Sequence, residues 1–593
     1  MGKLIHYISG RVRQLMWVIG VFLLFFYGCT STQKLVNSKW YEIKTDHFRI
    51  VTNDNPKQIK KLAVDLERFR VLQSDFFSSP DQQKLTLYAL NDRLSFEGVS
   101  GRESAQNTIG QFHNTSYGSY VLLNLNGNRF LPDNPARQTL FHEYTHFLTY
   151  SESKQLYPYW FSEGIAEVFS TVDFGENNKY HFGKIPIDRA ISLYRSREMP
   201  LDKLLSAKRG SLNVRDTEAL YASGWMLTHW MLFDTDRSKA LEEYLESYNA
   251  GADPITSLPK ALGMTFEELN EHYKKLSKSQ FNYFTDEFSD RSVIESPSIQ
   301  LMASSEAVAE LAHFMAISEK GSEALEKFIA YAEKKQVSSP SLKSALAIAL
   351  TGERNYTEAG KILETIPADY HGETWYLEAQ AKNELYAALE EEEVINPGKL
   401  KKIRDQYVQL VNAGGEVPAY WHELAITMQV LGYPRQKYME ILKQAYLRAP
   451  RETGIAWWYA MELYLNRDRD LFANVSQPLF MQISKEEPRA QLQSMLIDLG
   501  KGEELDFELE SEVSGLGQLM SAYREYPGTK ALAIAMDYRG AFVVGFNEEG
   551  INQADANQNA LQTCEEQREQ YQVKDRCELY AEGELLVNST NRM

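Results

Sequence analysis

The sequence predicts a multidomain protein with three folded parts: an α+β domain, an all-α helical array and a small α+β domain at the C-terminus. Three observations predict this fold class. The chain has 593 residues, more than one hydrophobic core supports, so about three or four domains are expected. Strand-like and helical patterns alternate over residues 39–288, and helical patterns alone fill 289–501. Two strand-like runs precede a helix within 523–593.

Composition and charge are those of a globular protein without a nucleic-acid partner. Hydrophobic residues make up 43% and charged residues 24% of the chain, which is ordinary for folded domains. The 63 basic and 81 acidic residues give a net charge of -18. Because a phosphate backbone is bound by a basic surface, this balance argues against nucleic acid as the main partner.

The N-terminus predicts export. Basic residues precede an apolar run over residues 15–27, and Cys29 follows shortly after it. A helix of that run is about 20 Å long, too short for the roughly 30 Å of bilayer hydrocarbon, so residues 1–28 are predicted to be a lipoprotein signal peptide. The small residue before Cys29 resembles a bacterial lipobox, although Phe26 and Tyr27 depart from that motif. The resemblance implies acylation of Cys29; the alternative is a tilted signal anchor with Cys29 unmodified.

An acylated Cys29 would anchor the mature chain in the membrane of the bacterial cell envelope, facing the periplasm. Thr30, not Asp, follows it, and resemblance to enteric sorting rules then favours the outer membrane. Residues 29–38 are predicted to be a polar tether. The other two cysteines, Cys564 and Cys577, are expected to form a disulfide, because neighbouring cysteines in an oxidising compartment pair most simply with each other.

Residues 39–288 show the alternation expected of an α+β domain. Turn residues separate the strand-like runs, and helical periodicity appears between and after them. Strands are predicted over 40–43, 47–51, 85–90 and 120–125, and helices over 56–78 and from about 135.

One helical stretch carries a metal-binding motif, H-E-x-x-H. Residues 140–147 read LFHEYTHF, which places His142 and His146 four apart with Glu143 between them. Residues four apart share a helix face, so both imidazoles can reach one metal ion. Glu143 lies about 100° round the helix, off the metal but beside a water bound to it, where a carboxylate can act as general base. The alternative is a helix whose histidines form hydrogen bonds in the core.

A second helical stretch offers a third ligand. Residues 159–167 read YWFSEGIAE, and Glu163 lies on a helix that can turn back beside the first. Together the two motifs resemble the gluzincin zinc peptidases, closest to the peptidase MA-like group with its W-x-x-E-G-x-A-E motif. The resemblance implies a thermolysin-like α+β fold with Zn²⁺ held by His142, His146 and Glu163. It also implies that Glu167 hydrogen-bonds a ligand histidine. The spacing is shorter than in thermolysin-like enzymes, and Glu167 as the direct ligand is the alternative.

Further residues follow from the same resemblance. Thr149 and Glu152 stand where metzincins need glycine and a third histidine, which excludes that family. Tyr221 matches a catalytic tyrosine that donates a hydrogen bond to the oxyanion, the alternative being a tyrosine packed under the zinc helix; His229 is a weaker candidate. The strand over 120–125 would be the edge strand that pairs with extended substrate.

The rest of the chain predicts a helical array and a small domain. Paired helical patterns fill 289–501, and two stretches resemble degenerate tetratricopeptide repeats, which stack into a curved solenoid. The solenoid is expected either to be a scaffold or to present a concave surface to a peptide or an envelope protein. Residues 502–522 are predicted to be an acidic linker, and 523–593 a small α+β domain with the Cys564–Cys577 disulfide.

The sequence therefore predicts a lipid-anchored zinc peptidase that acts on a peptide or protein substrate, with zinc-bound water activated by Glu143. An endopeptidase is favoured over an aminopeptidase, because no Gly-x-Met-Glu-Asn stretch of the kind that binds a free N-terminus is present. The alternative from another class is a non-catalytic envelope lipoprotein whose repeats serve as a binding or assembly scaffold. Zinc held for structure alone is disfavoured, because structural sites usually have four protein ligands.

Overall fold

The computed structural model describes residues 31–587 with several internal gaps. The gaps are 75, 78–84, 101–108, 126–134, 152–155, 176–178, 197, 209–210, 288–295, 319, 392–394, 484, 501–514 and 548–549. The predicted signal peptide and the lipid acceptor Cys29 lie outside the described residues. Among the residues that are described, no helix combines the length and the apolar character needed to span a bilayer.

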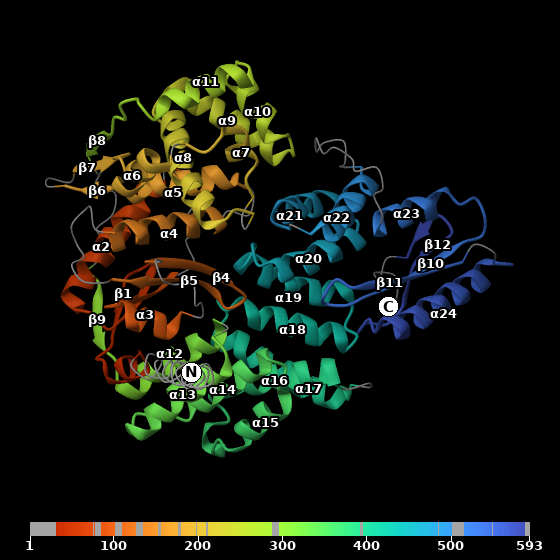
Figure 1. The fold of residues 1–593 in the computed structure, drawn as a ribbon. Helices are drawn as coiled ribbons and strands as arrows, with labels where there is room; N and C mark the ends of the chain where they lie inside the picture. Colours follow the sequence, from red (N-terminus) through yellow and green to blue (C-terminus); the bar gives the residue numbers. More distant parts are fainter. Residues whose placement is uncertain are drawn as a thin grey trace, which may run out of the picture.

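A six-stranded mixed sheet lies at the centre of the N-terminal domain, in the order β4-β5-β3-β2-β1-β9 (Figure 1). β2, β3 and β5 run parallel, whereas β1 is antiparallel to both of its neighbours and β4 is antiparallel to β5. The strands are β1 (Tyr41–Lys44), β2 (Phe48–Thr52), β3 (Leu85–Leu90), β4 (Gly110–Thr115), β5 (Gly118–Asn124) and β9 (Ser298–Leu301).

The two faces of this sheet are covered by different parts of the chain. Alternate residues such as Ile50 and Leu87 are buried against the helices of the N-terminal domain. The residues between them, such as Val51 and Tyr88, are buried in a second core that includes Leu311 and Phe314 of the helical array. The period-2 pattern of the strands therefore joins the sheet to both neighbours.

The helices of the N-terminal domain follow and surround the sheet. They are α2 (Pro56–Gln73), α3 (Arg93–Val99), α4 (Pro135–Ser151), α5 (Tyr159–Ser170), α6 (Ile187–Ser196), α7 (Leu201–Ser206), α8 (Val214–Leu232), α9 (Thr235–Asn249), α10 (Pro254–Ala261) and α11 (Phe266–Leu276). A second small sheet is formed by β6 (Asp173–Phe174), β7 (Lys179–Phe182) and β8 (Phe284–Glu287).

The helical array curves from beneath the sheet round to the tip of the β4–β5 hairpin (Figure 1). Successive helices of the array contact one another, as α14 does α15 and α18 does α19. The array contains α12 (Ser304–Ile317), α13 (Ser322–Lys334), α14 (Ser341–Gly352), α15 (Tyr356–Glu364), η2 (Ala368–Tyr370), α16 (Thr374–Glu391), α17 (Pro397–Ala413), α18 (Pro418–Val430), α19 (Arg435–Arg448), α20 (Thr453–Leu465), α21 (Arg469–Gln482) and α22 (Glu486–Asp498).

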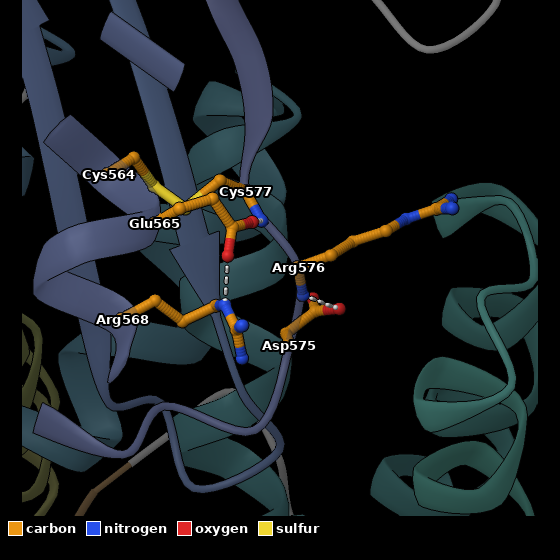
Figure 2. Close-up of a disulfide and its surroundings, with 6 residues drawn as sticks. All are labelled: Cys564, Glu565, Arg568, Asp575, Arg576 and Cys577. Atoms are coloured by element: carbon orange, nitrogen blue, oxygen red, sulfur yellow. Dashed lines mark hydrogen bonds and ion pairs between the residues drawn. A yellow bond between two sulfur atoms is a disulfide. The ribbon is translucent and has the colours of Figure 1, made fainter. Parts of the chain in front are cut away.

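The C-terminal domain is a four-stranded sheet with one long helix. The helix packs against β10 and β11, and a disulfide joins Cys564 on it to Cys577 before β12 (Figure 2). The predicted disulfide is thus confirmed. The elements are α23 (Leu516–Glu525), β10 (Ala531–Met536), β11 (Phe542–Asn547), α24 (Gln553–Tyr571), β12 (Glu578–Glu582) and β13 (Leu585–Leu586).

Several elements differ from those expected. α2 ends at Gln73 and not at residue 78. Residues 31–37 of the predicted tether are helical and bury Leu35 and Val36, because these apolar side chains pack against α3 and the array. β9 lies beyond the predicted end of the domain at residue 288 and pairs with β1. α23 occupies part of the predicted linker. The strand over 120–125 is interior, and β4 is the edge strand beside it.

Candidate metal centre

Two neighbouring helices bring the predicted ligands together. α4 carries His142 and His146 one turn apart, and α5 turns back beside it with Glu163. His142 Nε2 and His146 Nε2 are 3.0 Å apart, and Glu163 Oε2 lies 3.3 Å from the first and 3.2 Å from the second. All three side chains are buried. Their nitrogen and oxygen atoms converge on one point, as the ligands of a metal ion do.

The donor set and its spacing fit zinc. Imidazole nitrogen and carboxylate oxygen bind Zn²⁺ at about 2.0–2.1 Å, almost always in a tetrahedron when the site has four ligands. Neighbouring ligand atoms in such a tetrahedron are about 3.3 Å apart, close to the three separations in this site. Two histidines and one carboxylate also leave a fourth position for water or substrate, which is the arrangement of catalytic zinc sites.

Two charged residues behind the ligand cluster, Glu167 and Arg189, orient His142. Its Nδ1 lies 3.3 Å from Glu167 Oε1, which accepts a 2.7 Å hydrogen bond from Arg189 on α6. Burial lowers the pKa of His142, but its hydrogen bonds to Glu163 and Glu167 outweigh burial and raise the pKa to about 10. Burial raises the pKa of Glu167, but Arg189 and His142 lower it to about 2. The ionised Glu167 therefore accepts the Nδ1 proton of His142 and keeps Nε2 directed at the ligand cluster.

The predicted general base faces the edge strand of the sheet. Glu143 Oε2 accepts a 2.8 Å hydrogen bond from the backbone amide of Phe112 in β4. A two-residue turn joins β4 to β5, so the backbone groups of Gly110, Phe112 and Asn114 face away from β5. A Cβ on Gly110 would lie 2.5 Å from Thr139 Cγ2 and 3.5 Å from Glu143 Cγ. Glycine at this position therefore lets the edge strand approach α4 closely.

Two glycines allow α5 and α8 to cross in direct backbone contact. A Cβ on Gly164 would lie 2.5 Å from the carbonyl oxygen of Gly224, and a Cβ on Gly224 would lie 2.5 Å from that of Trp160. Neither position has room for a larger side chain while the helices stay where they are. Glu163 directly precedes Gly164, and Tyr221 lies about one turn before Gly224, so this crossing brings both residues to the histidines.

Tyr221 lies beside the ligand cluster, whereas His229 does not. The ring of Tyr221 is centred 6.1 Å from that of His142, and the Arg189 guanidinium carbon lies 5.1 Å from its centre. His229 instead places Nε2 3.0 Å from the carbonyl oxygen of Gly183, and burial lowers its pKa. His229 is therefore held in the core by the backbone of Gly183, which gives no support to the weaker role predicted for it.

Glu167 was predicted from the sequence, whereas Arg189 and the strand β4 are two parts of the site that the sequence did not reveal. Glu167 lies on the Nδ1 side of His142, outside the ligand cluster, which is where a supporting carboxylate is expected. Its partner Arg189 belongs to no motif. The sequence marks it only as a basic residue on an amphipathic helix that follows the second motif. β4 reads GQFHNT, which is too polar to predict a strand, although Phe112 alternates with polar neighbours.

Comparisons of the chain with protein-family profiles, with curated proteins and with solved structures gave no match.

Proposed function

We propose that the chain is a zinc-dependent peptidase with a thermolysin-like catalytic domain over residues 39–288. The observation that carries the proposal is the convergence of His142 Nε2, His146 Nε2 and Glu163 Oε2 within 3.0–3.3 Å of one another. Buried ionisable groups must either pair with one another or bind a metal ion, and these three side chains are close enough to do either. Two histidine nitrogens that face each other as well as the carboxylate favour the metal ion. A scaffold has no physical need for this cluster.

The residues around the centre divide the chemistry between them. A bound Zn²⁺ would supply a Lewis acid that lowers the pKa of water and polarises a peptide carbonyl. Glu143 takes the proton of the attacking water and later delivers it to the leaving amine. The Tyr221 hydroxyl donates a hydrogen bond to the carbonyl oxygen as negative charge develops on it. Glu167 and Arg189 hold the ring of His142 in the orientation that metal binding requires.

An extended peptide segment is the proposed substrate. Apart from the Phe112 amide, which donates to Glu143, the outward-facing main-chain groups of β4 offer the hydrogen bonds that an added strand needs. These groups lie next to Glu143, through the amide of Phe112. Because recognition by main-chain bonds does not require a free terminus, internal cleavage is expected.

The cell envelope is the proposed location. The disulfide between Cys564 and Cys577 persists in an oxidising compartment, and export directed by residues 1–28 would deliver the chain to one. Acylation of Cys29 would then hold it at the membrane, with the outer membrane as the expected site.

Metal removal and replacement tests the activity. The mature chain is expected to hydrolyse casein or a quenched peptide library, to lose this activity with a chelator, and to regain it with one equivalent of zinc. Glu143→Gln should lower kcat by about 100- to 10,000-fold, the usual contribution of a general base. Glu218→Gln, a change of an exposed carboxylate on α8, is the matched control.

Three results would contradict the proposal. Hydrolysis that survives the chelator, or that survives Glu143→Gln, would mean that another site is responsible. A chain that binds zinc yet cleaves no substrate in the library would favour the non-catalytic scaffold.

A further inference from the structure

The tip of the β4–β5 hairpin is inserted into the helical array. Ser116 and Tyr117 form its two-residue loop, and Gly118 follows with a φ of 105°, which glycine adopts without strain. The tip therefore points the backbone carbonyl of Ser116 and the side chain of Tyr117 away from the catalytic domain and towards α12, α16 and α18.

The backbone of the tip serves as a helix cap. The amide of Ala419, in the first turn of α18, donates a 2.6 Å hydrogen bond to the carbonyl oxygen of Ser116. The N-cap residue of α18, Val417, has no side-chain group that could accept from the first turn. A free amide at a helix N-terminus needs an acceptor, and the hairpin provides it across the domain boundary.

The side chain of the tip enters a buried polar cluster. The Tyr117 ring lies 5.1 Å from Lys382 Nζ and 6.1 Å from the ring of His313. Lys382 is paired with Glu423 at 2.8 Å, and His313 with Glu378 at 3.1 Å. The Tyr117 hydroxyl is buried, and burial together with the nearby carboxylate of Glu378 raises its pKa, so that the group stays neutral.

A cavity lies on the face of β4 that points to the array. It has a volume of about 320 Å³ and lies between β4, β5 and α12, and Gln111, His113 and Phe314 are among the residues that line it. β4 is also an edge strand, so β5 is its single neighbour in the sheet. With a cavity on one face and β5 as its single strand neighbour, β4 is positioned by its contacts with α4 and by how its tip is fixed.

We infer that Tyr117 is a positioning residue of the peptidase and that the helical array is a structural part of its active site. Tyr117 and the Ser116 carbonyl fix the tip of the hairpin, the paired backbone of β4 carries this restraint to Phe112, and the Phe112 amide orients Glu143. The inference rests on the proposed function and deepens it: the array holds the strand on which both substrate and general base depend.

Hydrogen exchange and kinetics on the full mature chain test this inference. In Tyr117→Ala the backbone amide of Phe112 is expected to exchange at least about tenfold faster, because opening of β4 costs less. kcat should fall by about 10- to 100-fold, as expected when a catalytic group is misplaced by about 1 Å, while zinc content stays unchanged. Tyr117→Phe keeps the aromatic ring and should show the exchange rate at Phe112 and the kcat of the wild type. Tyr370→Ala, an exposed tyrosine of the array, is the matched control.

Tyr117→Leu keeps most of the apolar volume and tests the inference if the alanine variant unfolds; it should show the same changes to a smaller degree. Exchange at Phe112 that is the same in Tyr117→Leu, Tyr370→Ala and wild type would overturn the inference, as would an effect confined to KM. The exchange rates decide this point even for a chain that cleaves no peptide, a result that would contradict the proposed function alone.

Discussion

Gly164→Ala is the substitution that most directly probes how the fold builds the metal centre. The new methyl carbon would lie 2.5 Å from the carbonyl oxygen of Gly224, whereas ordinary contact begins at 3.4 Å, so α5 must move by about 0.9 Å. Metal–ligand distances tolerate about 0.2 Å. Because Glu163 is the next residue on α5, this movement exceeds what the ligand set can absorb. We expect zinc affinity to fall by at least about 100-fold, the upper end for loss of a supporting contact.

The same change should lower stability, although alanine favours a helix. Overpacking against a rigid neighbour costs about 1–3 kcal/mol, which exceeds the gain of about 0.5–1 kcal/mol in helix propensity. Gly360→Ala in α15 is the matched control, because a Cβ there meets only Asn383 Nδ2 at 3.6 Å. It should be neutral or stabilising. Zinc competition titration and thermal unfolding measure both effects. Unchanged zinc affinity in Gly164→Ala would refute the link between this crossing and the ligand geometry.

Three further predictions concern the supporting shell and the C-terminal domain. Arg189→Met should weaken zinc binding by about tenfold, because Glu167 loses the cation that pairs with it. Arg195→Met, on the exposed side of α6, should leave zinc affinity unchanged. Equal affinities in the two variants would contradict the role of Arg189 and Glu167 in orienting His142. Replacing both Cys564 and Cys577 by alanine should lower the free energy of unfolding of the C-terminal domain by about 2–3 kcal/mol in denaturant titrations, and an unchanged midpoint would contradict this. Burial raises the pKa of Asp575 to about 7, so its stabilising contribution is complete below about pH 4 and is lost as pH rises through 7. Asp575→Asn should gain at least about 1 kcal/mol over wild type between pH 5 and pH 7, and a constant difference across that range would rule out the shift.

The sequence was most informative where a local pattern carried the structure. The strand predicted over 85–90 is β3 to the residue, because its apolar run is bounded by turn residues. The i, i+4 spacing of His142 and His146 correctly placed both on one helix face. The position of Glu163 depended on α5 turning back, which the second motif implied and the helix-crossing glycines make sterically feasible.

Long-range pairing is what the sequence could not reveal. β9 is four exposed residues long, and its partner β1 lies more than 250 residues earlier in the chain, so no local pattern marks it. β4 is polar because it is an edge strand with little buried surface. The interior strand β5 was therefore assigned the edge position. Contact between the Tyr117 tip and the array likewise depends on tertiary packing and not on any motif.

Metal analysis of the purified mature chain decides whether His142, His146 and Glu163 hold zinc, with Glu143→Gln and Glu163→Ala beside the wild type and hydrolysis followed in parallel. We expect about one zinc per chain in the wild type and in Glu143→Gln, loss of zinc in Glu163→Ala, and loss of hydrolysis in both variants. A wild-type chain that binds no zinc under metal-replete conditions, or a Glu163→Ala variant that keeps both zinc and hydrolysis, would contradict this expectation.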